Sequence, residues 1–279
     1  MPELPEVERV RQTLAPAMTG ARFEHVTLNR ADLRQPFPRG FAKRLRGQTV
    51  LQLLRRGKYL LATLSSGDVL LMHLGMSGGF RVESTPAKRR RLDLDAALEY
   101  RHDHVVFTMS SGMTVTFNDP RRFGVMDLLS ANGGSHTAIE RMGPEPLSAA
   151  FDAEMLAAGC TGRRTSLKVA LLDQRVVAGL GNIYASEALH VAHLSPHRLA
   201  TTIATASGRP RPSAVRLAAA IKSVLRRAIS LKESASYRGT RFRVYDREGD
   251  GCPTKGCRGT IERVWQAGRS TFYCPVCQR

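Results

Sequence analysis

The chain has 279 residues, of which 42% are hydrophobic, and it carries a formal net charge of +18. This length and composition suit one large or two modest domains with real cores, and no apolar run approaches the length of a membrane span. The charge favours a polyanionic partner such as nucleic acid over a membrane surface, although a solvated basic face would give the same total.

The first element in the chain is a helix predicted over residues 5–19. Pro5 suits its first position, Val7, Val10 and Leu14 recur on one face, and Gly20 ends it. No basic, apolar leader precedes this helix, so the chain is expected to be cytoplasmic. A nucleic-acid partner of the kind that its charge favours would place it at the nucleoid.

From about residue 21 to residue 130 the pattern predicts β-structure, because short apolar runs alternate with turn signals such as SSGD and SSGM. The runs are VLQLL (50–54), YLLATL (59–64), VLLMHL (69–74), HVVFTM (104–109) and MTVTFN (113–118). They predict an antiparallel sandwich or barrel-like domain, with 82–101 as a charged loop. The stretch ANGGSHT (131–137) is predicted to begin a linker.

Beyond the linker the hydrophobic period becomes helical. One predicted helix ends at Gly179, and its face consists of Leu167, Ala170, Leu171 and Gln174. A second has a face made of Ala214, Leu217, Ala218, Ile221, Leu225 and Ala228. RFRVY (241–245) reads as a strand. The predicted domains are therefore 1–130, 151–240 and 241–279, with a linker over 131–150.

Four of the five cysteines cluster near the end of the chain, in the spacing Cys252-x4-Cys257-x16-Cys274-x2-Cys277. Two close pairs separated by a hairpin-sized stretch are what a tetrahedral four-cysteine zinc site requires. TIERVWQ and RSTFY read as the two strands of that hairpin, with Ala267 and Gly268 at its tip. The pattern predicts a zinc ribbon holding one structural zinc ion, in preference to an iron–sulfur cluster or four free thiols. Cys160 stands alone and reads as a small buried residue.

Several stretches together resemble one family, the bacterial formamidopyrimidine-DNA glycosylases of base-excision repair. They are MPELPEVE (1–8), RRGKYLL (55–61), HLGMSG (73–78), NDPRRFG (118–124), GLGNIYASE (179–187) and GRSTFYCPVCQ (268–278). The resemblance runs nearly end to end. It implies an α+β multidomain fold: an N-terminal helix with a β-sandwich, a helix–two-turns–helix module that binds DNA, and a zinc finger.

The resemblance gives the extreme N-terminus a chemical role. Removal of Met1 is expected because Pro2 is small, and the new terminus is then a secondary amine that can attack the anomeric carbon of a deoxyribose. The iminium that results is an electron sink for strand cleavage. Glu3 is placed to move protons at the sugar or the departing base. By itself, PELPE would read as an ordinary helix start.

The same family implies roles for residues of the β-domain. Lys58 is implied to act at a phosphate and in proton transfer, and His73 to contact a phosphate; a solvated lysine and a satisfied histidine are the structural alternatives. Met76, Arg121 and Phe123 are implied to fill the gap left when a nucleotide is flipped out of the stack. Alone, Met76 and Phe123 would read as core residues, and Arg121 as a partner of Asp119.

Further DNA contacts are implied nearer the C-terminus. Asn182 follows a tight turn before a helix and is implied to bind phosphate, although Asn is more often a helix cap. Arg269 is implied at the same phosphate and in the second elimination step, and His102 and Arg163 are implied to contact DNA. Basic charge is densest in 163–232, where it would add salt-dependent affinity.

Two departures from the family pattern matter. The first cysteine pair has four intervening residues where many relatives have two, which a ribbon can absorb. The loop after the second long helix is also short: only SLKESASYRGT (230–240) remains where family members carry a longer, glycine-rich loop implicated in closing over an oxidised purine. We therefore expect 8-oxoguanine to be a weaker substrate, relative to formamidopyrimidines, than it is for full-loop relatives.

The sequence predicts a bifunctional DNA glycosylase and AP lyase that acts on oxidised purines in damaged duplex DNA, with β- and δ-elimination and no cofactor besides structural zinc. A monomer is expected. One alternative is an endonuclease VIII-like glycosylase for oxidised pyrimidines. The LPEVE motif and the Arg121–Phe123 pair oppose it, and the short loop leaves it open. The other is a non-catalytic zinc protein that binds DNA, in which Pro2 and Glu3 would have no function.

Overall fold

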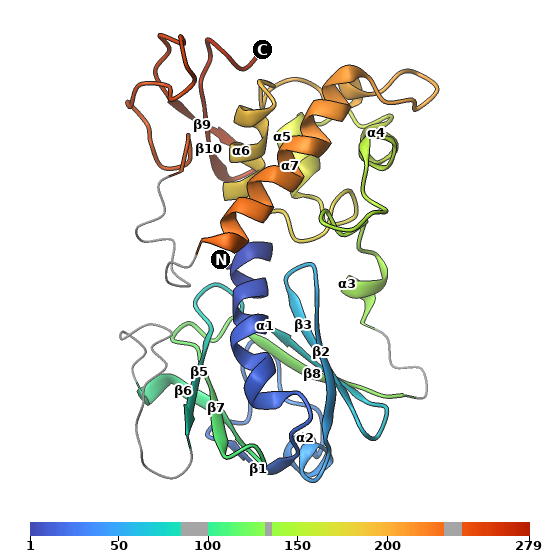
Figure 1. Ribbon diagram of the computed structural model, residues 1–279, viewed down its shortest axis with the longest axis vertical. Coiled ribbons are helices and arrows are strands. Elements are labelled where there is room, and N and C mark those ends of the chain that lie inside the picture. Colours follow the sequence, from blue (N-terminus) through green and yellow to red (C-terminus); the bar gives the residue numbers. More distant parts are fainter. Residues whose placement is uncertain (85–99, 132–135, 232–241) are drawn as a thin grey trace. The chain divides into compact units, whose positions relative to one another are not determined.

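The computed structural model describes residues 1–84, 100–131, 136–231 and 242–279. The described residues divide into two compact units, one formed by Met1–Glu140 and the other by the residues from Arg141 onwards (Figure 1). Parts of three predictions lie outside the described residues: 85–99 of the charged loop with its KRRR run, 132–135 of the linker, and 232–241 of the shortened loop.

The first unit begins with helix α1 (Leu4–Met18), within one residue of the predicted bounds. Glu3 and Glu6 form a capping box at its start, in which the Glu3 backbone N–H donates to Glu6 Oε2 at 2.9 Å. Such a box satisfies amide groups that the first helical turn leaves without partners. Val7, Leu14 and Met18 are fully buried on one face of the helix. The capping box therefore fixes the position of Glu3, and with it the start of the chain, at the first turn of the helix.

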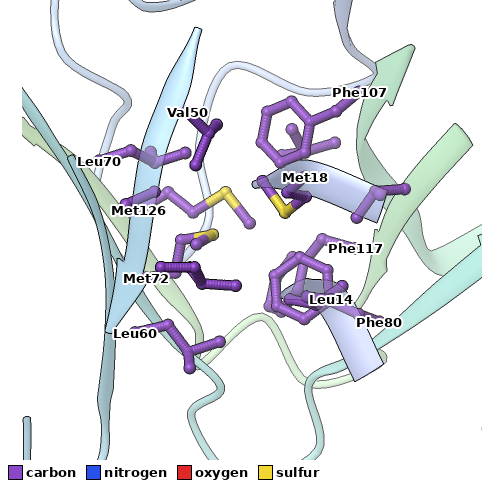
Figure 2. Close-up of a cluster of buried hydrophobic side chains, with 14 of the residues drawn as sticks. Leu14, Met18, Val50, Leu60, Leu70, Met72, Phe80, Phe107, Phe117 and Met126 are labelled. Carbon is purple, nitrogen blue, oxygen red and sulfur yellow. The ribbon is translucent and has the colours of Figure 1, made fainter. Parts of the chain in front are cut away.

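Two antiparallel four-stranded sheets form the rest of the first unit (Figure 1). One sheet has the order β1 (Phe23–Leu28), β6 (Asp103–Met109), β7 (Met113–Asn118) and β5 (Gly79–Ser84). The other has the order β2 (Val50–Arg56), β3 (Tyr59–Leu64), β4 (Val69–His73) and β8 (Val125–Leu129). Figure 2 shows Leu60, Leu70 and Met72 facing Phe80 and Phe117 across the core. The predicted sandwich is confirmed. A short helix, α2 (Phe41–Leu45), packs on β1.

The predicted loop over 82–101 is wrong at its first residues, because Val82–Ser84 complete strand β5 and pair with β7. The loop was predicted from the KRRR run at 88–91, which lies beyond this strand. In the structure Arg81 is buried, and its guanidinium lies 2.6 Å from Asp103 and 3.2 Å from Glu83. Paired charge can occupy a strand in which unpaired charge would be costly.

The second unit is mainly helical, and it follows the short helix α3 (Thr137–Glu140). Its helices are α4 (Ala153–Cys160), α5 (Leu167–Leu172), α6 (Asn182–Val191) and α7 (Pro212–Ser230). Two short 3₁₀ turns, Tyr100–His102 in the first unit and Ala200–Ile203 in the second, complete the described helical segments. Among the described residues, no helix is long and apolar enough to cross a membrane.

Helix α5 ends at Leu172, so the prediction that Gln174 lies on its face and Gly179 ends it is wrong. The Gln174 side chain instead holds the following loop. Its amide nitrogen donates to the Leu172 and Leu180 carbonyls at 3.1 and 2.9 Å, and its oxygen accepts the Gly179 N–H at 2.8 Å. These bonds replace the helical ones and bring the chain round to the start of α6.

Strands β9 (Glu262–Gln266) and β10 (Arg269–Tyr273) form the predicted hairpin near the C-terminus. The predicted strand over 241–245 is wrong for its described residues. The backbone N–H groups of Arg243, Val244 and Tyr245 donate to the carboxylate of Glu187 on α6, at 2.8, 2.9 and 3.0 Å. A side chain thus takes the place of a neighbouring strand.

Candidate active site

The N-terminal amino group lies among charged side chains of the first unit. Burial lowers the pKa of the Met1 ammonium below its usual value of 8.0, Glu3 raises it, and Lys58 lowers it. Glu6 and Arg121 act on the same group, with opposite signs. Glu3 itself is only 3% exposed. The structure therefore brings Glu3, Lys58 and Arg121 to the end of the chain that Pro2 would occupy after loss of Met1.

Lys58 lies in the two-residue turn between β2 and β3, where Gly57 has φ +57°. A glycine at the first central position is what a type II′ hairpin turn requires. The Arg55 guanidinium holds this turn, because it donates to the Gly57 carbonyl at 3.0 Å and to Glu8 of α1 at 3.1 Å. Lys58 is 7% exposed, so the alternative of a solvated lysine is wrong.

His73 at the end of β4 is a neutral hydrogen-bond donor. Burial, together with the charges of Lys58 and Arg34, lowers its pKa from 6.5 to about 4. Its Nδ1 accepts the Gly75 N–H at 3.0 Å, so the proton of the neutral ring is on Nε2. Arg34 lies in none of the sequence motifs, and its charge acts on both His73 and Tyr59.

Two loops bring Met76, Arg121 and Phe123 to the surface of the first unit. Asp119 is fully buried, and its carboxylate accepts the Ser77 hydroxyl and the Gly124 N–H, each at 2.7 Å. Met76 and Phe123 are 44% and 41% exposed, so the alternative of core residues is wrong. The Arg121 guanidinium lies 5.0 Å from the centre of the Phe123 ring.

The Arg121 backbone N–H donates to the Asp119 carboxylate at 3.3 Å. No ion pair joins the two side chains among the described contacts. The pairing of Arg121 with Asp119 that the sequence allowed is thus replaced by a loop-stabilising role for Asp119.

We expect Gly75→Ala to lower the stability of the first unit by about 1–3 kcal/mol. Gly75 has φ +65°, and a Cβ there would lie 2.3 Å from the carbonyl carbon of Phe123. Gly20→Ala is the matched control, since Gly20 has φ +78° but nothing within 4 Å of the added carbon. Thermal unfolding of both variants measures the difference. An equal loss in the two would mean that the contact between the loops contributes nothing.

Asn182 is the first residue of α6 and connects that helix to the hairpin. Its Nδ2 donates to the Ser270 carbonyl at 2.9 Å, and its Oδ1 accepts a hydrogen bond from Lys168 Nζ. The cap position belongs to Gly181, so the helix-cap alternative for Asn182 is wrong. Lys168 is fully buried and also donates to the Ser270 carbonyl at 3.4 Å. The structure therefore brings Asn182 beside the strand that begins with Arg269.

Arg269, Arg163 and His102 differ in their surroundings. Arg269 is exposed beside the turn Ala267–Gly268, where both φ angles are positive as in a type I′ turn. The Arg163 guanidinium donates to Asp173 at 2.9 Å and to the Gly159 carbonyl at 2.7 Å. His102 is half-buried, with Arg101 Nε 3.0 Å from its Nε2. The position of Lys168 beside Asn182 was not predicted, because a lysine in an amphipathic helix is usually solvated.

The four C-terminal cysteines are arranged as a metal site. Their sulfur atoms all lie within 4.8 Å of one another, with Cys252 to Cys277 at 3.6 Å and Cys257 to Cys274 at 3.7 Å. Tetrahedral zinc with Zn–S bonds of about 2.3 Å places its ligands about 3.8 Å apart. The residues present therefore fit a four-thiolate zinc ion. The four intervening residues of the first pair are accommodated by a turn in which Cys257 N–H donates to the Thr254 carbonyl.

The chain matches two family models, the formamidopyrimidine-DNA glycosylase N-terminal domain over residues 1–126 and its H2TH domain over residues 142–239. Proteins named formamidopyrimidine-DNA glycosylase from Rhodopseudomonas palustris and Azorhizobium caulinodans are 57% and 53% identical over the full length of both chains. These alignments span 296 and 293 positions against the 279 residues of this chain, so they contain gaps in this chain.

Solved structures give the same result. A MutM protein in complex with DNA containing carbocyclic 8-oxo-G has a TM-score of 0.82 and 29% identity over the whole of both chains. MutM from Thermus thermophilus has a TM-score of 0.78 and 37% identity, and covers 99% of this chain and 98% of its own. A Lactococcus lactis Fpg bound to abasic-site DNA has a TM-score of 0.82 and 28% identity over 99% of both chains.

Proposed function

Because the chain belongs to the formamidopyrimidine-DNA glycosylase family, we propose that it removes oxidised purines from duplex DNA through its N-terminal amine and then cuts the strand. The chain is a base-excision repair enzyme with the fold of that family. The endonuclease VIII-like and non-catalytic alternatives gain no support from these relatives. We propose that it acts as a monomer on chromosomal DNA in the cytoplasm.

The observation that supports the mechanism best is the set of charges around the N-terminus. After loss of Met1, the Pro2 nitrogen would bond to C1′ of the flipped nucleotide, and the bond from C1′ to the base would break. Buried Glu3 would deliver a proton to the sugar ring oxygen, and ring opening would leave an iminium. Lys58 would then contact a DNA phosphate and take part in the proton transfer of the elimination step.

The remaining residues would hold the DNA. Met76, Arg121 and Phe123 would fill the space of the flipped nucleotide, as their exposure allows. His73 would donate Nε2–H to a phosphate, and His102 and Arg163 would add contacts to the backbone. Asn182 and Arg269, joined through the Ser270 carbonyl, would bind a phosphate at the start of α6, and Arg269 would assist the second elimination.

We propose that Cys252, Cys257, Cys274 and Cys277 hold one zinc ion. When bound, it would supply structural cross-linking of the hairpin and no chemistry at the sugar, because all of its ligand positions would be filled by thiolates. The residues of this chain would do the rest: the hairpin presents Arg269, and β10 presents the Ser270 carbonyl to Asn182.

Borohydride trapping tests the proposed function. The full chain would be incubated with duplexes that carry 8-oxoguanine, a formamidopyrimidine, an oxidised pyrimidine or an abasic site, and then reduced. We expect a covalent adduct that peptide mapping locates at Pro2, with the purine lesions ahead of the pyrimidine. Tight binding without an adduct on any duplex would overturn the proposal.

The adduct should form faster as pH rises, up to the pKa of the terminal amine, because only the neutral amine attacks. We expect Lys58→Met to move this rise to higher pH, since the Lys58 charge lowers the pKa of the amino terminus. Glu3→Gln should move it to lower pH, since the Glu3 charge raises that pKa. Trapping rates on abasic-site DNA across pH 5–9 measure both shifts. Shifts of the same sign would contradict the assignment.

We expect Lys168→Met to weaken binding to abasic-site DNA by about 10- to 150-fold, which corresponds to the roughly 1.5–3 kcal/mol of a hydrogen bond to a charged group. The change removes the donor that fixes Asn182 Oδ1 and the Ser270 carbonyl. Lys222→Met is the control, because Lys222 donates only to the Ser148 carbonyl among the described hydrogen bonds. Fluorescence anisotropy at fixed salt measures both. Equal affinities would show that Lys168 does not position the phosphate site.

A further inference from the structure

A buried histidine lies against the cysteine cluster and belongs to none of the sequence motifs used above for function. His190 is fully buried near the end of α6. Its Nε2 lies 3.4 Å from Cys252 Sγ and 3.2 Å from Thr254 Oγ1. These are hydrogen-bond distances for sulfur and oxygen acceptors, so the ring directs one nitrogen at a proposed metal ligand.

The other ring nitrogen determines where the proton is. Arg243 Nε lies 3.3 Å from His190 Nδ1. A guanidinium has only donors, so Nδ1 must accept, and the proton of the neutral imidazole is then on Nε2. His190 therefore donates towards Cys252 and Thr254. This polarity is the one that a thiolate ligand needs, since the thiolate can only accept.

The wide first cysteine pair supplies a second donor. Thr254 is one of the four residues between Cys252 and Cys257, and its Oγ1 lies 3.8 Å from Cys277 Sγ. A Cys277 thiolate bound to zinc can only accept, so the hydrogen bond between these two atoms is then donated by the Thr254 hydroxyl. Arg243 therefore donates to His190, and two of the four sulfur atoms have a donor beside them: Cys252 has His190, and Cys277 has Thr254.

Arg243 is itself fixed from α6. Glu187 lies one turn before His190, and its carboxylate accepts the backbone N–H of Arg243 at 2.8 Å and those of the next two residues. Two side chains on one face of α6 therefore hold the segment that leads into the hairpin: Glu187 binds its backbone, and His190 binds its side chain. This helix also begins with Asn182.

We propose that His190 is a positioning residue of the zinc centre, which donates Nε2–H to the Cys252 thiolate and stabilises the metal-bound state. The inference rests on the zinc site proposed above. A four-thiolate zinc centre carries net negative charge, and N–H donors to its sulfur atoms stabilise that charge and fix the ligand directions. Loss of such an outer partner typically weakens metal binding by about 10- to 100-fold.

Zinc competition on the full-length protein tests the proposal. The zinc content of the wild type is measured first, and zinc is then titrated against a chromophoric chelator in the wild type and three variants. His190→Leu removes the donor at similar volume. His190→Gln keeps a donor for sulfur and an acceptor for Arg243. His193→Asn changes an exposed neighbour whose φ of +55° an asparagine tolerates, and serves as the control.

We expect His190→Leu to lose zinc affinity by about 10- to 100-fold, with His190→Gln and His193→Asn close to the wild type. Unchanged affinity in His190→Leu would overturn the proposal. Equal losses in the leucine and glutamine variants would also overturn it, because they would trace the effect to packing. A wild type without zinc would overturn the zinc site itself, which the first measurement separates from failure of the histidine role.

A second measurement does not depend on the folding of any variant. The wild type is loaded with ¹¹³Cd in place of zinc, and histidine nitrogen and proton resonances are recorded. The proposal expects His190 as the Nε2–H tautomer, with its Hε2 proton coupled to the cadmium through sulfur. An Nδ1–H tautomer, or a ring nitrogen bonded directly to cadmium, would overturn it.

Discussion

Pro2→Gln should abolish covalent trapping on abasic-site DNA and slow base release by on the order of 10⁶-fold, the scale of loss when an enzyme loses its nucleophile. The bulkier residue would keep Met1 in place, so the amine would be primary and displaced by one residue. Burial and Lys58 would still lower its pKa and Glu3 would still raise it, but the amine would belong to residue 1 instead of the proline. Reduction with borohydride and single-turnover excision measure the two losses.

Pro5→Ala is the matched control for this variant. Pro5 lies in the same segment, within the first turn of α1, and Glu3 and Glu6 would still cap the helix. It should retain trapping and excision, and mass spectrometry should show that Met1 is absent from the control and present in Pro2→Gln. An adduct that forms in Pro2→Gln as fast as in the wild type would place the nucleophile elsewhere, on a lysine such as Lys58.

The second large effect is expected from Cys274→Ser, which should unfold the hairpin and eliminate specific binding to DNA. Among the described residues, the core of this segment consists of Val244, Ile261, Phe272 and Cys274, against which Tyr245 and the other three cysteines pack partly buried. A core of this size cannot hold a hairpin without a cross-link, whereas a structural zinc contributes about 10–16 kcal/mol. Without it, the Ser270 carbonyl would leave Asn182 and Lys168.

Cys160→Ala is the control for cysteine loss, because Cys160 is fully buried in α4 and outside the metal cluster. It should keep its zinc and its affinity for DNA. Metal analysis and anisotropy with abasic-site DNA measure both variants. Retention of full affinity by a zinc-free Cys274→Ser protein would show that the hairpin folds without metal. It would also show that DNA binding by Arg269 does not depend on zinc.

The sequence predicted the elements whose pattern is local. Strands β3 and β4 alternate or run apolar, and α1 repeats its buried residues every three or four positions, so period alone located them. Residues 242–245 were misread, because RFRVY has strand composition and the competing acceptor is Glu187, more than fifty residues earlier. Strand propensity expresses a fit to neighbours that the segment does not contain.

Pro2, Glu3 and Lys58 could be named as candidate site residues from the sequence, because the family motifs that contain them are linear. The supporting residues could not, because their roles depend on distant partners. Lys168 is read as solvated until Ser270, which lies about a hundred residues later, is found beside it. The proposed role of His190 follows only from its contacts with Arg243 and Cys252, which lie more than fifty residues later in the chain. Buried polar groups must be satisfied, but the sequence does not say by which partner.

The capping box at the start of α1 also sets the electric field at the proposed nucleophile. Aligned peptide dipoles give a helix a partial positive charge at its N-terminus, which disfavours a nearby cation by about 0.3–1 kcal/mol. Pro2 directly precedes the cap residue Glu3, so the dipole of this fifteen-residue helix would favour the neutral amine before attack. After attack it would destabilise the cationic adduct and promote its breakdown. The carboxylates of Glu3 and Glu6 oppose this field, and the lifetime of the adduct would be set by the balance between them.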